Sequence, residues 1–202
     1  DVYKRQELSK KIYTCKINKL SNNPLSYEMQ YIFGFVGEKI IKELNPYSII
    51  SLARNIDRYL NTIFENAVVK NLEVDIFISK LNNIRDLTIN KDLKKDIEEI
   101  IYVVKKDFLG ATKIEIPIGF CHGDFTFSNM IVGDNGELCL IDFLHTFCES
   151  PLQDYAKLNQ ELKYGWSLRY ESKYSKTKSK IAFSKIQTLI RTLDILEKRW
   201  PK

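Results

Sequence analysis

A run of polar side chains between residues 122 and 142 has the types and spacing that suit chemistry on phosphate groups. Asp124 lies five residues before Asn129, and Asp142 follows further along the chain. Carboxylate and amide oxygens are the ligands that a hard cation such as Mg²⁺ prefers. Phosphoryl transfer needs a metal to neutralise charge and a side chain that orients or deprotonates the attacking hydroxyl. These three side chains are candidates for both tasks.

A β-hairpin is predicted between Asn129 and Asp142. Residues 130–132 and 138–141 are apolar, and the segment 133–137 between them is rich in Asp, Asn and Gly. This pattern is typical of two antiparallel strands joined by a short loop. Because a hairpin brings its two ends together, we expect Asn129 and Asp142 to face one point.

The same residue types have simpler interpretations. An isolated set of Asp and Asn residues on loops is usually turn chemistry, and Asp134 is expected to serve only the turn. His122 is interpreted as a buried bracing residue rather than a base or ligand. Cys121 is expected to be a small packed residue, and His145 a loop residue without a catalytic duty. The spacing, the hairpin and the helix that follows favour a site.

That helix is predicted to begin after Ser150. Ser is a good N-cap, Pro151 fits the first helical position, and Gln153 completes a capping-box pattern. We expect the helix to run to about residue 164. Asp154 lies in its first turn, where the helix dipole alone would favour an acid.

The elements that must position this segment are mostly helices. Apolar residues repeat every three or four positions in several stretches, and one alternating stretch at 114–118 contains Pro117, which argues against a central strand. Residues 171–180 are polar and are predicted to be a loop. Helices are predicted over 49–64, 74–81, 93–108 and 182–200, and strands over 12–15 and 27–33 around a turn at 21–24.

Composition narrows the possible classes. The chain has 202 residues, 44% hydrophobic content and a net charge of +5, with only two His. Four cysteines without a C-x-x-C pair, in a sequence whose first residues do not resemble a signal peptide, predict reduced thiols in a cytoplasmic protein. No zinc site is expected, because neither of the two His is spaced from a Cys as metal ligands usually are. No apolar run approaches the ~20 residues that span a bilayer. The mild basic excess predicts no nucleic-acid partner.

The spacing His122-x-Asp124-x-x-x-x-Asn129, with Gly123 between the first two, resembles the aminoglycoside phosphotransferase and choline kinase family of the protein-kinase-like superfamily. The resemblance implies that Asp124 is the catalytic base and that His122 braces the loop. It also implies Mg²⁺ and ATP as cofactors.

The same resemblance implies roles for Asn129, Asp142 and Asp154. Asn129 and Asp142 would bind the Mg²⁺. Asp154, within Asp154-Tyr155-Ala156, would hold the backbone of the catalytic loop. This role and that of an ordinary first-turn acid both remain open for Asp154.

The segment from Glu28 to Gly34 is similar to the hinge of that family. By this resemblance Met29, Gln30, Tyr31 and Ile32 would bind ATP, through backbone hydrogen bonds to the adenine. Packing in a core is an equal alternative for Tyr31. Upstream of the hinge there is no G-x-G-x-x-G pattern, and nothing marks a phosphate-binding lysine.

The implied fold is α+β and protein-kinase-like, a predominantly helical C-terminal lobe with a catalytic β-hairpin. Residues 1–34 are expected to be a remnant of the N-terminal lobe and the hinge, with most of that lobe missing. Residues 35–202 are expected to form the helical catalytic lobe.

The resulting hypothesis is an ATP-dependent phosphotransferase that acts on the hydroxyl of a small molecule, such as a sugar. From residue 151 onward the chain has 12 Lys and Arg but only 5 Asp and Glu. This basic excess favours a neutral or anionic acceptor over a polycationic one, and an ordinary solvated basic surface is the alternative. A non-catalytic kinase-like binding module and, at lower rank, a metal-dependent phosphohydrolase are the alternatives.

Overall fold

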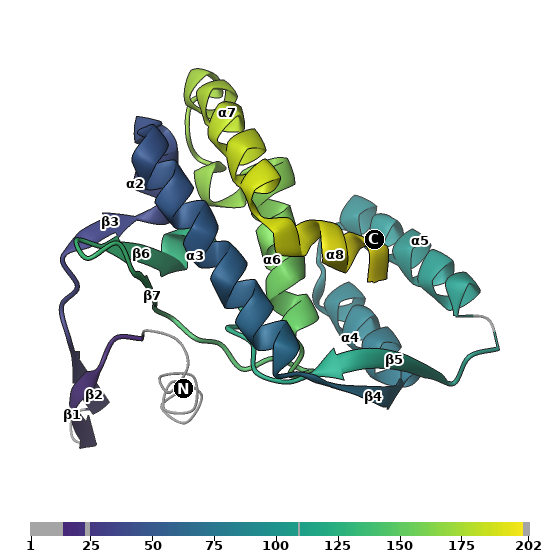
Figure 1. The fold of residues 1–202 in the computed structure, drawn as a ribbon. Coiled ribbons are helices and arrows are strands. Elements are labelled where there is room, and N and C mark those ends of the chain that lie inside the picture. Colours follow the sequence, from purple (N-terminus) through teal and green to yellow (C-terminus); the bar gives the residue numbers. More distant parts are fainter. Residues whose placement is uncertain (1–13, 23–24, 109, 200–202) are drawn as a thin grey trace. The chain divides into compact units, whose positions relative to one another are not determined.

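The computed structural model describes residues 14–22, 25–108 and 110–199. Helices and small antiparallel sheets make up this part of the chain (Figure 1), which confirms the predicted α+β class. The chain divides into two units. One takes in the residues up to Ala67 together with those from Gly119 onward, and the other is Val68–Ile118.

The first unit contains the predicted hairpin. Strand β6 (Met130–Gly133) pairs with β7 (Leu138–Leu140), and β3 (Gly34–Val36) pairs with the other edge of β6. All three strands are antiparallel, with Met130 opposite Leu140. A separate two-stranded ribbon consists of β1 (Ile17–Asn22) and β2 (Leu25–Met29). The hairpin prediction is therefore confirmed.

The first unit also contains several helices. They are α2 (Gly37–Glu43), α3 (Pro46–Glu65), α6 (Pro151–Tyr164), α7 (Lys173–Leu189) and α8 (Arg191–Arg199), with short 3₁₀ turns at Phe127–Asn129 and Trp166–Leu168. Helices α2 and α3 pack against the three-stranded sheet. The start of helix α3 is well defined. Pro46 fits the first turn, and the Asn45 side chain caps the helix by accepting hydrogen bonds from the backbone N–H groups of Tyr47 and Ser48.

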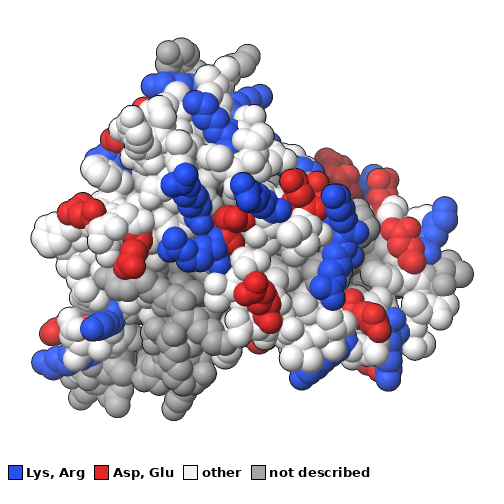
Figure 2. Space-filling model, viewed as in Figure 1, with Lys and Arg blue, Asp and Glu red and all other residues white. Residues whose placement is uncertain are grey.

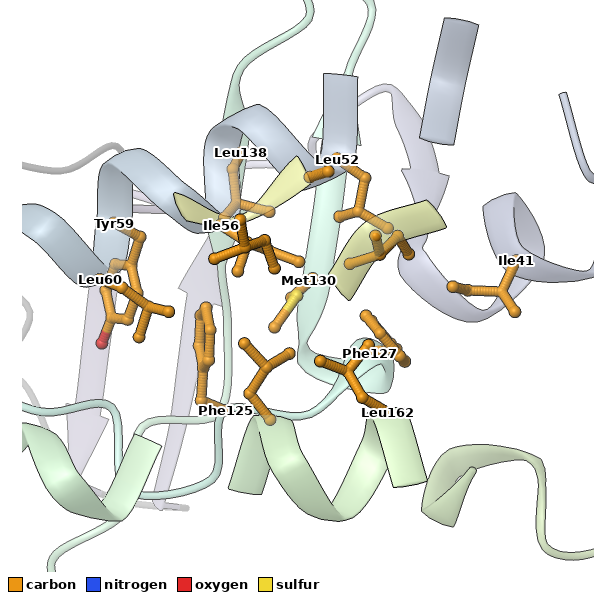
Figure 3. Packing of buried hydrophobic residues seen from close by; sticks show 14 of the residues in the cluster. Ile41, Leu52, Ile56, Tyr59, Leu60, Phe125, Phe127, Met130, Leu138 and Leu162 are labelled. Carbon is orange, nitrogen blue, oxygen red and sulfur yellow. The ribbon is translucent and has the colours of Figure 1, made fainter. Parts of the chain in front are cut away.

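The core of this unit lies between α3, the hairpin and α6 (Figure 3). Leu52, Ile56 and Leu60 on one face of α3 are fully buried, as are Met130 of β6 and Phe125 of the loop before it. Each such side chain contributes on the order of 2 kcal/mol by leaving water. The catalytic-loop candidate is thus anchored by its own apolar residues.

The second unit is a β-ribbon with two helices. Strand β4 (Val68–Glu73) pairs with β5 (Lys113–Ile118), and α4 (Val74–Leu87) and α5 (Lys91–Asp107) lie between them in sequence. Pro117 is tolerated because β5 has only one neighbouring strand in its sheet. Strand β4 was not predicted, since its alternation is weak and most of its residues are exposed.

Three sequence predictions about elements need correction. The predicted loop at 171–180 is wrong, because α7 already begins at Lys173, where the Ser172 hydroxyl caps Ser175 N–H. Lysine is a good helix former, so a segment with a polar, lysine-rich composition can be a surface helix rather than a loop. The predicted helix 182–200 is broken at Ile190, which is extended (ψ 93).

The third correction concerns the strand predicted over 27–33, which ends at Met29. Residues 12–13 of the other predicted strand and 23–24 of the predicted turn lie outside the described residues, while Thr14 forms a parallel bridge with Leu140. Within the described ranges, no helix is both long enough and apolar enough to cross a membrane.

Candidate active site

The loop that carries Asp124 has a sharp bend at Gly123. Gly123 adopts φ +88, and a Cβ at this position would lie 2.5 Å from the carbonyl oxygen of Leu144. An L side chain is disfavoured at this φ and would also clash with backbone. The glycine between His122 and Asp124 is therefore required by the close approach of the segment that follows Asp142.

Asp154 holds the backbone of this bend. Its carboxylate is fully buried and accepts hydrogen bonds from His122 N–H at 2.6 Å and Gly123 N–H at 2.8 Å. The Tyr59 hydroxyl donates a third at 2.5 Å. Burial, and then the nearby Asp154 charge, raise the pKa of Tyr59 well above its ordinary value. The phenol therefore remains a donor across the physiological range.

The His122 ring joins the loop to the segment around Asp142. Its Nε2 lies 2.6 Å from Ile141 O and its Nδ1 accepts from Asp124 N–H at 3.2 Å. Since a carbonyl only accepts, this pattern defines a neutral ring that donates from Nε2. The His122 carbonyl also accepts from Leu144 N–H at 2.9 Å. Ile141 and Leu144, which hydrogen-bond to His122 in this way, lie on either side of Asp142 in the sequence.

Two donors hold the Asp124 carboxylate. Asn129 Nδ2 lies 3.0 Å from Asp124 Oδ2 and 2.9 Å from Asp124 O. Lys157 Nζ, from α6, lies 3.0 Å from Asp124 Oδ1. The Asp124 side chain is 28% exposed, so it remains open to a substrate. Sequence reasoning missed Lys157, because nothing in the motif marks a residue on the next helix.

Asp142 has a left-handed backbone, with φ 55, which is uncommon for a residue other than Gly. Strain of this kind is often found at functional sites. The hairpin closes beside it, since Ile141 N–H donates to Asn129 O at 3.1 Å. Asp142 is exposed, and its carboxylate makes no hydrogen bond or ion pair with another described residue.

The donor set of Asn129 and Asp142 fits Mg²⁺. The Asn129 nitrogen faces Asp124, which leaves its Oδ1 as an oxygen ligand, and Asp142 offers a carboxylate. Mg²⁺ commonly takes one or two protein ligands and completes its shell with phosphates and water. In the ranges that the structure describes, no group of three or more His, Cys, Asp and Glu side chains is placed to hold a metal.

A second buried carboxylate on α6 supports the far end of the loop. Glu161 is fully buried and accepts hydrogen bonds from Phe127 N–H at 3.3 Å and Ser167 N–H at 3.0 Å, and from the Ser167 hydroxyl. Burial raises the pKa of Glu161. Sequence reasoning missed it, although an acid seven residues after Asp154, on the same helical stripe as buried Leu158, was a usable signal.

The four residues proposed for adenine lie upstream of β3. Met29 ends β2, and Gln30 N–H donates to Lys16 O at 2.8 Å. Tyr31 is 76% exposed and Ile32 is half-buried. This segment leads directly into β3, which pairs with β6 of the β6–β7 hairpin. The structure thus connects the proposed hinge to the hairpin, while the contacts to adenine remain a prediction.

Comparison with known proteins gives one family match. Residues 81–170 match the family described as the phosphotransferase enzyme family. No curated protein matches the chain. The matched segment contains Asp124, Asn129, Asp142 and Asp154.

Proposed function

We propose, from the premise that residues 81–170 belong to the phosphotransferase enzyme family, that the protein transfers the γ-phosphoryl group of ATP to a hydroxyl of a small molecule. The family resemblance seen in the sequence is thereby confirmed. The ATP and Mg²⁺ requirements, the acceptor class and the roles of individual residues are our proposal.

One observation carries the assignment. The Asp124 carboxylate is partly exposed and held by two donors, on a loop whose backbone is bound by the buried Asp154 carboxylate. A base for a substrate hydroxyl needs this combination of fixed orientation and access. A loop that served only as a turn would not need a buried carboxylate to hold two consecutive N–H groups.

In this proposal each side chain of the site has a separate role. Asp124 orients the acceptor hydroxyl and accepts its proton. Asn129 and Asp142 hold Mg²⁺, which supplies neutralisation of phosphate charge when bound. His122, Asp154 and Glu161 keep the loop in place.

Charge near the site supports a neutral or anionic acceptor. The Lys157 ammonium lies 3.0 Å from the carboxylate that must meet the acceptor hydroxyl. This ion pair offsets the attraction that the Asp124 carboxylate would otherwise exert on a cationic acceptor. The basic excess after residue 151 acts in the same direction. A sugar or a phosphorylated metabolite is therefore favoured over a polyamine-like acceptor. Since all four cysteines are free thiols in the structure, we propose a reducing, cytoplasmic location.

The proposal is tested by ADP release from Mg-ATP with a panel of acceptors. The panel contains hexoses, hexose phosphates, choline and an aminoglycoside. We expect turnover with a neutral or anionic acceptor that depends on Mg²⁺. Turnover with the aminoglycoside alone would refute the acceptor class. Nucleotide binding without turnover of any acceptor would favour the non-catalytic binding module.

A further inference from the structure

A cavity of about 240 Å³ lies along α3, away from the residues proposed for phosphoryl transfer. Its wall consists of side chains between Tyr47 and Arg58 of α3 and of Gly136, in the turn between β6 and β7. None of Asp124, Asn129 and Asp142 lines it. The cavity is therefore separate from the candidate active site.

Two arginines dominate the chemistry of this cavity. Arg54 and Arg58 are four residues apart on α3, so they share one face of the helix. Neither guanidinium forms a hydrogen bond or ion pair within the described part of the chain. In Figure 2 both basic and acidic side chains appear over the area where Figure 1 draws α3.

No acidic side chain in the described part of the chain forms an ion pair with either arginine. The lining of the cavity contains no Asp or Glu. Asp57, the acid between the two arginines in sequence, accepts hydrogen bonds from Thr192 N–H at 2.9 Å and the Thr192 hydroxyl at 2.7 Å. Glu137, next to Gly136 in the hairpin turn, is bound by Asn135 Nδ2 at 2.9 Å.

The rest of the wall is held in place without a ligand. Asn55 Nδ2 donates to Gly136 O at 2.8 Å and to Ser51 O at 2.9 Å. The Ser51 hydroxyl donates to Gly136 O at 3.4 Å. The positive end of the α3 dipole is close by, and the first turn contains no acid. Tyr47 adds an exposed aromatic ring.

We propose that this cavity binds a small phosphorylated metabolite of about monosaccharide size. Arg54 and Arg58 contact its phosphate, because a guanidinium fork matches phosphate oxygens with paired hydrogen bonds. Tyr47 lies against its carbon skeleton. The volume corresponds to about eight water molecules, which suits a phosphate with a short carbon chain or one ring. This inference does not depend on the proposed phosphotransfer.

The test is calorimetric titration of the protein with glucose 6-phosphate, inorganic phosphate and glucose at 150 mM NaCl, a salt concentration that screens weak surface attraction. The variant R54Q/R58Q removes both charges. The matched control is K91Q/K95Q, which removes two exposed charges four residues apart on α5. The variant R54K/R58K keeps the charge and loses the planar forks.

We expect glucose 6-phosphate to bind the wild type and K91Q/K95Q equally, R54K/R58K more weakly, and R54Q/R58Q at least tenfold more weakly. Glucose should not bind. The backbone amide signals of Tyr47 and Gly136 should shift during the titration. Absence of binding to the wild type, binding that survives in R54Q/R58Q, or equal loss in the control pair would overturn the proposal. Because both arginines are exposed, unchanged thermal unfolding of the variants verifies that they fold.

Discussion

The Lys157 ammonium lies 3.0 Å from one carboxylate oxygen of Asp124, the residue that we propose as the base. The pair links helix α6 to the catalytic loop at the surface where the acceptor must arrive. Asp154 and Glu161 on the same helix bind the loop backbone on either side of Asp124. Helix α6 is thus the element that positions the proposed catalytic loop, through charged side chains spaced along it.

Replacing Lys157 by Met is expected to lower kcat for phosphoryl transfer roughly tenfold, because Asp124 loses one of its two anchors. The KM for ATP should change little, since Lys157 contacts the base. K157R should retain most of the rate. The control is K163M, the same change on the same helix, which should leave the rate as it is. A K157M enzyme with wild-type kcat would refute this role.

The catalytic segment was predictable from the sequence because its signals are local. The spacing of Asp124 and Asn129, the Asp-Asn-Gly turn of the hairpin and the Ser-Pro start of α6 each act within a few residues. By contrast, Tyr59 reaches Asp154 from 95 residues away in sequence. Partners brought together by tertiary packing leave no local pattern, so Tyr59 and Lys157 became visible only in three dimensions.

Replacing Asp154 by Asn is expected to destabilise the fold by about 3 kcal/mol. The buried carboxylate accepts from His122 N–H, Gly123 N–H and the Tyr59 hydroxyl, and an amide offers only one accepting oxygen. Urea unfolding measures the change. The control D96N alters an exposed acid in the middle of α5 and should change stability by less than about 0.5 kcal/mol. Equal stability of D154N and D96N would contradict the bracing role.

Glu161 is expected to make stability fall with rising pH. Burial raises its folded pKa above the unfolded value, so folding favours the protonated form. This contribution is fully present below the unfolded pKa of about 4.3, and it is lost as the pH rises through the folded pKa. Because E161Q cannot ionise, the difference in unfolding free energy between wild type and E161Q should change between pH 4 and pH 8. A difference that stays constant over this range would refute the prediction.

Two substitutions of Asp142 can test the role of its carboxylate charge separately from the role of its left-handed backbone. Asn tolerates the left-handed region, so D142N should keep the stability of the wild type while weakening Mg²⁺-dependent ATP binding at least tenfold. D142A should weaken ATP binding as well and also lose about 1 kcal/mol of stability from its backbone at φ 55. Calorimetric titration with and without Mg²⁺, beside urea unfolding, checks both effects. Wild-type ATP affinity in D142N would remove Asp142 from the metal site.

The most direct measurement compares transfer of the γ-phosphoryl group of ATP by the wild type and by D124N, with the acceptor that the panel identifies. Asp124 is partly exposed and held by Asn129 and Lys157, so its replacement by an amide should leave the fold and ATP binding unchanged. We expect D124N to lose at least a hundredfold in kcat. Transfer by D124N at the wild-type rate would contradict the proposed role of Asp124.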